Sequence, residues 1–513
     1  MKQFIARQPF VSLALFFVGA LILHAIFFAL PFHKNMNVIV ISIDSLRADH
    51  MSLYGYGRDT TPNIDAWAKQ GNVFTNYFAT SFLTPISEGS VQTGDYPFTN
   101  GVINFTSDLR GTVLTIAEIL KQNGYSTAAF GSSPEYIIND SLDADFSRGF
   151  DTFLPYVTSS DLPASTVNRP NWRSSNAPII KTIDWLNTHK SADQPFYLWI
   201  PLGGVHAPFN DEFPAHFEDP TYTGFFSKTV QDEFNNVYGF VFNGLRYQSD
   251  DINAGPLLPV AKFISADEQY IVDRYDDGIL GTDAMLQPLF SYLQRTGLDR
   301  STIVILESEH GETLGERGYI AHYDIYDETL HTPLIIKIPG FAGEKISALT
   351  SGIDVFPTLF AFLHLKVPAV EGINYAPLIT HATSTPPRAD LFITRAPLWE
   401  RITELVPEFT KKDDIAHYHD TAIRSAKWKL IHRMSRDILA TYGWWSLLTG
   451  VPQTTPEYQL YDEVTDPKEL DNVYAAHKND SDVMALKTKL DAFDQKIVSQ
   501  MPGPTTDQLQ PYF

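Results

Sequence analysis

The sequence predicts a large α/β domain, built on a mostly parallel β-sheet sandwiched by helices, and a smaller C-terminal α+β subdomain. Short apolar runs of strand-like composition alternate with helix-like segments, and polar side chains follow where several of these runs end. In the last quarter of the chain this alternation gives way to hairpin-like patterns. With 513 residues, 44% of them apolar and 13% aromatic, the chain can bury a substantial core.

The N-terminal segment has the pattern of a membrane anchor. Lys2 and Arg7 precede an apolar run over residues 10–32. A helix of about 20 apolar residues crosses a bilayer, whereas a secretory signal has an apolar region of about 7–15 residues and then a small-residue cleavage site. We therefore predict an uncleaved transmembrane helix, with residues 1–9 in the cytoplasm; a cleaved signal and a buried helix are the alternatives. The positive flank predicts a single-pass protein of the inner membrane whose bulk faces the periplasm.

The main domain is expected to alternate strands and helices. Residues 37–43 form a β-rich apolar run, typical of a buried parallel strand. Later segments have apolar residues at helical spacing, and the longest of them closes with a glycine. The predicted order is strand 37–43, helix 60–71, helix then strand within 112–130, helix 179–190, strand 195–203, helix 273–297, strand 301–312 and strand 331–340.

The C-terminal part has a different pattern. Residues 417–433 and 456–467 have the pattern of strands in a hairpin-type unit, and a helix is predicted over 485–501. We therefore expect a main domain over residues 36–385 and an α+β subdomain over 386–513.

Charge and cysteine content exclude several classes of protein. The net charge is −22, with 60 acidic against 38 basic residues. Nucleic-acid binding needs clustered Lys and Arg to neutralise phosphates, so no nucleic-acid partner is expected. The chain has no cysteine, which excludes disulfides, thiolate metal ligands and cysteine nucleophiles.

Three metal-binding side chains follow predicted strands. Asp44 comes directly after the first strand, and Glu309 and His310 lie where a later strand runs into polar residues. The carboxyl ends of parallel strands meet at one edge of a sheet, so these side chains are expected to converge. Carboxylates with an imidazole suit a hard or borderline divalent ion, and the sequence therefore predicts one site for Zn, Mn, Ca or Mg, with a second site that would involve His206 and His322 as the alternative.

Hydroxyl and imidazole groups supply candidates for the chemistry. Thr84, Ser87 and Ser90 lie in a polar turn before a predicted helix, where each is either a helix cap or a nucleophile facing the aligned N–H groups. His206 follows a predicted strand, and His322 lies in a later loop. Either histidine could donate to a substrate oxygen or be a surface or core residue.

The order of many segments carries a family resemblance. These segments include VIVISIDSLRADHMSLYGY, TSFLTPISEGSVQTGDYP, PFYLWIPLGGVHAPF, ILESEHGETLGERG and AIRSAKWKLI. Over roughly residues 36–475 the chain resembles the sulfatase branch of the alkaline-phosphatase superfamily. The resemblance implies an alkaline-phosphatase-like fold and a metal-dependent ester hydrolase or transferase. It implies that the metal ligands are Asp44, Thr84, Glu309 and His310, and that the catalytic residues are Thr84, His206 and His322.

Several positions depart from the pattern of true sulfatases. Those enzymes have C-x-P-S-R or S-x-P-S-R, whose first residue is oxidised to formylglycine, whereas this chain has Thr84-Pro85-Ile86-Ser87-Glu88. The Arg position therefore holds an acidic residue. Ser45 replaces the usual second Asp of the first metal segment, and Glu309 replaces an Asp.

A threonine nucleophile resembles the phosphatase, phosphodiesterase and lipid phosphotransferase branches instead. We therefore expect an enzyme that acts on phosphate (di)esters, such as lipid headgroups or envelope glycans, through a phospho-threonine intermediate. One alternative is a sulfuric ester hydrolase, and another is a catalytically silent metal-binding scaffold of the same fold. Nothing in the sequence predicts the oligomeric state.

Overall fold

The computed structural model describes most of the chain from Met36 to Gln500. The described residues are 36–103, 107–132, 146–162, 176–189, 194–206, 215–224, 265–316, 320–322, 324–395, 420–433 and 456–500. The anchor predicted over residues 10–32 lies outside these ranges. Among the described residues, no helix is both long and apolar enough to span a bilayer.

The described strands of the main domain form an eight-stranded sheet in the order β11-β2-β10-β7-β1-β6-β4-β5. Among them, β10 alone runs antiparallel to its neighbours, which confirms the mostly parallel sheet. The strands are β1 (Asn37–Ile43), β2 (Asn72–Phe74), β4 (Ser126–Phe130), β5 (Thr152–Leu154), β6 (Phe196–Leu202), β7 (Thr302–Glu307), β10 (Leu334–Lys337) and β11 (Lys345–Ile346).

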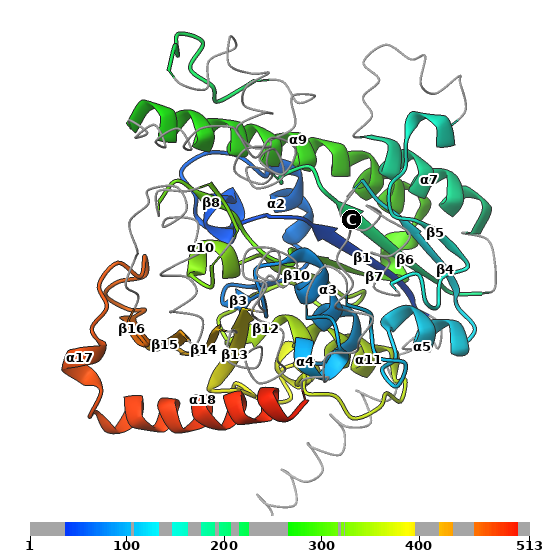
Figure 1. Cartoon of the computed structure of the whole chain (residues 1–513). Helices are drawn as coiled ribbons and strands as arrows, with labels where there is room; N and C mark the ends of the chain where they lie inside the picture. The colour runs from blue at the N-terminus through cyan, green and yellow to red at the C-terminus, as the bar shows by residue number, and fades with distance from the viewer. Residues whose placement is uncertain are drawn as a thin grey trace, which may run out of the picture.

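Helices cover both faces of this sheet (Figure 1). One face carries α2 (Pro62–Ala68), α7 (Ala177–His189) and α9 (Ser265–Thr296), and the other carries α3 (Thr84–Thr93), α5 (Ile116–Gln122) and α11 (Val355–Leu363). Along β1, Val38 and Val40 belong to one apolar core, and Ile39 and Ile41 belong to the other. Both faces of the strand are buried, which explains its continuous apolar sequence.

Shorter elements connect these layers. Two small sheets pair β3 (Tyr77–Phe78) with β12 (Thr350–Ser351) and β8 (Thr313–Leu314) with β9 (Ile320–Ala321). The short helices are η1 (Ala48–His50), η2 (Ser52–Tyr54), α4 (Pro97–Asn100), η4 (Ser159–Asp161), η7 (Leu298–Arg300), α10 (Asp327–Leu330), η8 (Gly352–Asp354) and α12 (Ala376–Ile379).

The C-terminal part is an antiparallel sheet packed against a long helix, as Figure 1 shows at its lower edge. Its described strands are β13 (Asp390–Arg395), β14 (Asp420–Ser425), β15 (Trp428–Arg433) and β16 (Tyr458–Asp462). Leu430 and Leu460 from the sheet pack with Leu486 and Leu490 of α18 (Ser481–Gln500), and α17 (Tyr474–His477) precedes that helix. This confirms the predicted C-terminal α+β subdomain.

Two predicted boundaries change. The long helix α9 begins at Ser265, earlier than the predicted 273, because the polar first turn hides the start of its periodic pattern. Strand β7 ends at Glu307 although the prediction extended it to residue 312. The chain leaves the sheet there, so the acidic residues beyond this point lie in a loop at the sheet edge.

Candidate active site

The loop after β1 holds Asp44 at the carboxyl edge of the sheet. Asp44 is buried, and the Ser45 hydroxyl donates a hydrogen bond to its Oδ1 over 3.0 Å. Ser45 has φ of +62°, a conformation that costs a non-glycine residue free energy. Tyr275 of α9 stabilises this turn, because its hydroxyl accepts from the Arg47 amide (2.8 Å) and donates to the Ser45 carbonyl (2.7 Å). The strained turn therefore has a fixed geometry.

The loop after β7 is tied to the first loop through Ser308. Its hydroxyl accepts from the Leu46 amide over 3.0 Å and donates to the His310 carbonyl over 2.7 Å. The His310 Nδ1 lies 3.0 Å from the Gly311 carbonyl, which can only accept, so Nδ1 carries the proton. The unprotonated Nε2 then faces the site and lies 3.6 Å from Asp44 Oδ1.

Thr84 is the first residue of α3 and is buried. Its Oγ1 lies 2.8 Å from His310 Nε2, and the hydroxyl donates because that nitrogen has no proton. Pro85 follows in the first turn, where its fixed φ favours helix initiation. The hydroxyl therefore lies at a helix N-terminus, where the helix dipole favours a negatively charged group.

The predicted metal ligands meet at this point. One donor atom from each of Asp44, Glu309 and His310 lies within 4.8 Å of the others, and all three side chains are buried. Ligands of one ion at about 2.0–2.6 Å are separated by no more than about 5 Å, so this donor set fits a divalent ion. The two carboxylates and one imidazole suit both hard and borderline ions.

The two predicted histidines flank the same site. The ring of His322 lies 4.2 Å from that of His310 and 5.0 Å from that of His206, measured between centroids. Glu312, which the sequence analysis did not select, lies 3.2 Å from His322 Nδ1 and orients that ring. The structure thus brings together every predicted site residue, including Thr84.

A second group of possible metal ligands, made of three glutamates, lies beside the group of Asp44, Glu309 and His310. Donor atoms of Glu88, Glu307 and Glu309 are within 4.8 Å of one another, and all three residues are buried. Burial raises the pKa of Glu88 to about 7 and, with the neighbouring carboxylates, holds the pKa values of Glu307 and Glu309 well above the usual range. Sequence reasoning noted Glu88 as a departure from the sulfatase pattern and missed Glu307, which comes two residues before the predicted ligand Glu309.

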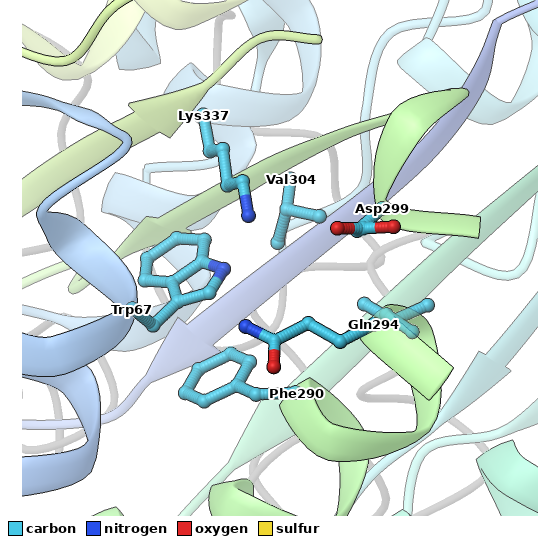
Figure 2. A pocket seen from close by; sticks show the side chains of 7 residues that line it. Trp67, Phe290, Gln294, Asp299, Val304 and Lys337 are labelled. Carbon is cyan, nitrogen blue, oxygen red and sulfur yellow. The ribbon is translucent and has the colours of Figure 1, made fainter. Parts of the chain in front are cut away.

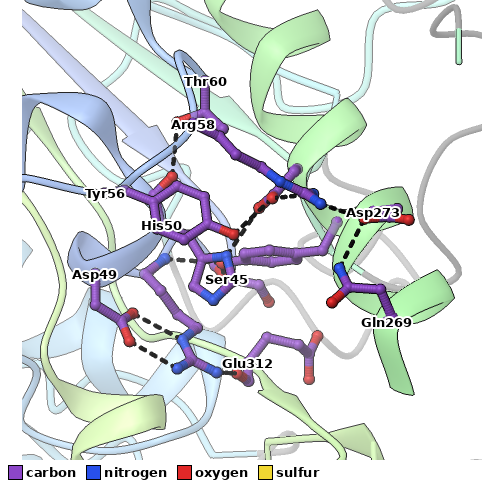
Figure 3. A network of polar contacts seen from close by, with 12 residues as sticks. Ser45, Asp49, His50, Tyr56, Arg58, Thr60, Gln269, Asp273 and Glu312 are labelled. Atoms are coloured by element: carbon purple, nitrogen blue, oxygen red, sulfur yellow. Dashed lines mark hydrogen bonds and ion pairs between the residues drawn. The ribbon is translucent and has the colours of Figure 1, made fainter. Parts of the chain in front are cut away.

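Arg47, next to the site, has a structural role. Its guanidinium forms ion pairs with Asp49 (2.8 Å) and Glu316 (2.6 Å) and donates to the Glu312 carbonyl. This arginine therefore holds the first loop against the chain after β7. Figure 3 shows the contacts to Asp49 and to the Glu312 carbonyl beside the neighbouring pair of Arg58 and Asp273.

A pocket elsewhere in the domain is separate from these groups. Figure 2 shows its lining, which includes Trp67, Phe290, Gln294, Asp299 and Lys337. Asp299 lies in η7 before the start of β7, whereas the acidic groups lie at the end of β7. This pocket therefore lies away from the carboxyl edge of the sheet, and its mainly apolar lining offers no counterpart to the clustered carboxylates and imidazoles.

Comparisons with known proteins agree with this geometry. The sulfatase family model matches residues 36–365, and the model of the N-sulphoglucosamine sulphohydrolase C-terminal region matches residues 315–496. The chain is 25% identical to the N-acetylglucosamine-6-O-sulfatase of Bacteroides thetaiotaomicron, over 86% of this chain and 83% of that protein. It is 27% identical to the iduronate 2-sulfatase of Homo sapiens, over 65% of this chain and 70% of that protein.

Solved structures share the fold. The phosphonate monoester hydrolase from Silicibacter pomeroyi aligns with a TM-score of 0.62 and 21% identity, over 90% of this chain and 95% of that one. The sulfatase model covers well over half of the sequence and includes all eight described strands of the large sheet, and the second matched region includes the four described strands of the C-terminal sheet. The chain therefore belongs to the sulfatase family and has the architecture of its hydrolases.

Proposed function

We propose that this protein hydrolyses sulfate esters on sugars and uses Thr84 as its nucleophile. Relatives that cover most of this chain are named as sulfatases of N-acetylglucosamine and iduronate. These relatives favour sulfate esters, the alternative of the sequence analysis, over the phosphate esters expected first. The observation that carries the proposal is the Thr84 hydroxyl, buried at the N-terminus of α3 and 2.8 Å from His310 Nε2.

The donor set around Thr84 indicates what an ion would contribute. A divalent ion held by Asp44, Glu309 and His310 would neutralise charge on the ester and lower the pKa of the Thr84 hydroxyl. Asp44 is already oriented by Ser45, and His310 presents its unprotonated nitrogen, so the protein arranges these ligands before substrate binds. The metal is not identified by these residues.

The residues of this chain allow a two-step displacement. In the first step Thr84 gives up its hydroxyl proton to water, its Oγ1 attacks sulfur, the bond from sulfur to the alcohol oxygen breaks, and the sulfuryl group is transferred to Thr84. His206 or His322 protonates the departing oxygen. In the second step water attacks sulfur and releases sulfate, which restores the hydroxyl. The dipole of α3, whose N-terminus lies at Thr84, favours the anionic group in both steps.

This route differs from the formylglycine route. Formylglycine is an aldehyde derived from a cysteine or serine side chain, and the chain has no cysteine. Oxidation of threonine would give a ketone, because its β-carbon carries a methyl group. The covalent intermediate at Thr84 must therefore be cleaved by attack at sulfur.

Phosphate or phosphonate esters are the second candidate, and Thr84 itself favours them. A phospho-threonine is resolved directly by water at phosphorus, so a plain hydroxyl is a sufficient nucleophile. The buried Glu88 lies one turn along the helix from Thr84 and adds negative charge, which favours a monoanionic diester over a dianionic monoester.

The test compares ester classes with one set of variants. The purified full-length chain, loaded with Mn²⁺ or Zn²⁺, is assayed on sulfated N-acetylglucosamine, aryl sulfates, phosphate monoesters and phosphate diesters. Thr84→Ala should reduce kcat/KM at least about 10³-fold, whereas Ser90→Ala on the same helix should leave it nearly unchanged. Mass spectrometry of acid-quenched wild type should locate a sulfuryl or phosphoryl group on Thr84.

The outcomes separate the candidates. Cleavage of sulfate esters that depends on Thr84 supports the proposal, and cleavage of phosphate esters alone supports the second candidate. No turnover of any ester by folded, metal-loaded protein would favour the silent scaffold. Sulfate cleavage that survives in Thr84→Ala would show that another group is the nucleophile.

A further inference from the structure

Three buried glutamates form a group behind the proposed nucleophile. Glu88 lies on α3, Glu307 is the last residue of β7, and Glu309 lies in the following loop. Their relative exposures are 0%, 0% and 1%. Gln92 donates to one oxygen of Glu88 over 2.7 Å. The other oxygen of Glu88 and both oxygens of Glu307 receive no hydrogen bond of standard geometry from the described residues, although the Ser42 hydroxyl lies beside them.

Among the described residues, no lysine or arginine compensates the charge of Glu88 or Glu307. Within the described part of the chain, neither Glu88 nor Glu307 forms an ion pair with a lysine or arginine. Ser42 lies beside both, and its Oγ already accepts a hydrogen bond from Trp199 Nε1 at 3.1 Å. Its single hydroxyl proton can serve only one of the two carboxylates. Burying this much negative charge without a counter-ion is strongly unfavourable.

The spacing matches a cation site that is separate from the first one. The three donor oxygens lie within 4.8 Å of one another, which fits one ion at oxygen distances of about 2.0–2.6 Å. All three donors are carboxylates, whereas the group with Asp44 includes the imidazole of His310. Oxygen-only donors select hard ions such as Mg²⁺, Mn²⁺ or Ca²⁺ over Zn²⁺.

Glu309 belongs to both groups, and its carboxylate has two oxygens. We propose that Glu88, Glu307 and Glu309 bind a second hard divalent cation, and that Glu309 bridges it to the ion held with Asp44 and His310. Bridged two-metal sites hold their ions about 3.5–4 Å apart and stabilise charge on a reacting group jointly. Glu88 occupies the position where the sulfatases resembled by this chain have an arginine, so the cation restores positive charge close to Thr84.

The experiment uses Mn²⁺ as the probe on the metal-stripped, full-length chain. Elemental analysis after gel filtration counts bound manganese, and electron paramagnetic resonance reports whether two ions are close together. Wild type should bind two Mn²⁺ per chain and give a spin-coupled spectrum. Glu307→Gln and Glu88→Gln should each bind one Mn²⁺ and give an uncoupled six-line spectrum. Glu312→Gln, a control at the buried glutamate beside His322 that belongs to neither proposed ion site, should keep two.

Folding of the variants is checked in the same samples. Each Gln variant removes a buried charge, so its thermal unfolding midpoint in EDTA should equal or exceed that of wild type. One Mn²⁺ per chain in saturated wild type would overturn the proposal and indicate that the glutamates share protons instead. Two coupled ions retained in both Glu88→Gln and Glu307→Gln would overturn it as well.

The second cation site goes beyond the proposed function, and either of the two can be refuted without refuting the other. Turnover is measured on the samples used for metal counting. Two coupled ions without turnover of any ester would refute the proposed hydrolysis and leave the second site intact. Turnover that depends on Thr84 in a protein with one ion would refute the second site alone.

Discussion

Two groups of three carboxylates in this protein have similar spacing but differ in their ion-pair partners. Glu88, Glu307 and Glu309 lie at the carboxyl edge of the large sheet, and Asp327, Glu463 and Glu469 lie where α10 meets the C-terminal sheet. In each group the donor oxygens are within 4.8 Å of one another. We refer to them as the edge cluster and the C-terminal cluster.

The C-terminal cluster contains its own cations. Lys429 lies 2.9 Å from Asp327 and 2.7 Å from Glu469, and Arg424 lies 3.0 Å from Asp327 and 2.6 Å from Glu463. Burial alone would raise the pKa of Asp327, but the two cations outweigh it and lower that pKa to about 2. These ion pairs join α10 of the main domain to the C-terminal sheet.

The comparison shows that ligand spacing alone does not identify a metal site. Burial raises the pKa of glutamates in both clusters, of Glu88 to about 7 and of Glu463 to about 8, but among the described residues no lysine or arginine forms an ion pair with Glu88. The C-terminal cluster needs no metal ion, since lysine and arginine occupy the space between its carboxylates. Charge compensation therefore distinguishes a structural ion-pair network from a candidate cation site.

The largest expected difference between the clusters is in catalysis. Glu309→Gln removes a carboxylate from both proposed ion sites and should lower kcat/KM at least about 10³-fold on the ester that wild type cleaves. Glu469→Gln, the matched change in the C-terminal cluster, should alter kcat/KM less than about threefold, because that cluster contacts no reacting group. Steady-state kinetics on both folded variants checks this. Comparable losses of kcat/KM in both variants would contradict a catalytic role that is confined to the edge cluster.

The next largest effect concerns the stability of the C-terminal cluster. Lys429→Met leaves two buried carboxylates without their shared cation and should lower the free energy of unfolding by about 3–5 kcal/mol. Lys487→Met removes an i,i+4 pair with Asp491, which is partly exposed, and should cost about 0.3–0.5 kcal/mol. Urea unfolding of both variants measures the difference. A loss below about 1 kcal/mol for Lys429→Met would contradict the role of its ion pairs.

Metal removal should affect the edge cluster alone. A divalent ion present at about 100 times its Kd stabilises the folded protein by about 2.7 kcal/mol per site, so EDTA should lower the unfolding midpoint of wild type. Glu309→Gln should lose most of this response, and Glu469→Gln should keep it. Differential scanning calorimetry with and without EDTA makes the comparison. An EDTA response that is lost only in Glu469→Gln would show that the ion binds at the C-terminal cluster and not at the edge cluster.

The smallest effect is the pH dependence of the C-terminal cluster. Burial and nearby Asp327 raise the pKa of Glu463 to about 8, with Glu469 adding to the rise and with Arg424 and Lys429 opposing it. An unfolded glutamate titrates near pH 4.3, so the native state binds more protons between about pH 4.3 and 8. The free energy of unfolding contributed by this group should therefore fall as pH rises through that interval. Urea unfolding of Glu463→Gln across this interval should show a flatter profile, and an unchanged slope would contradict the assignment.

Much of the fold follows from local pattern. The strand at residues 37–43 is continuous and apolar because both of its faces are buried, and that signal is independent of the rest of the chain. The meeting of Asp44 with Glu309 and His310 was also predictable, since parallel strands end at the same sheet edge. The position of Thr84 as nucleophile depended on the family resemblance, because its local pattern equally fits a helix cap.

The membrane anchor predicted over residues 10–32 and the domain boundaries at 385 and 386 remain predictions. The preference for phosphate esters is less well supported than the sulfate alternative, because residue type around Thr84 does not identify the ester, whereas the named relatives are sulfatases.

The sequence by itself determined the alternation of strands and helices, the acidic ends of two central strands and the absence of cysteine chemistry. Only the tertiary structure decided which carboxylates share a counter-ion. Glu88 and Glu307 are separated by more than two hundred residues, and Asp327 and Lys429 by about a hundred. Electrostatic energy depends on distance and burial in the folded state, and neither quantity is encoded in the local pattern of a chain segment.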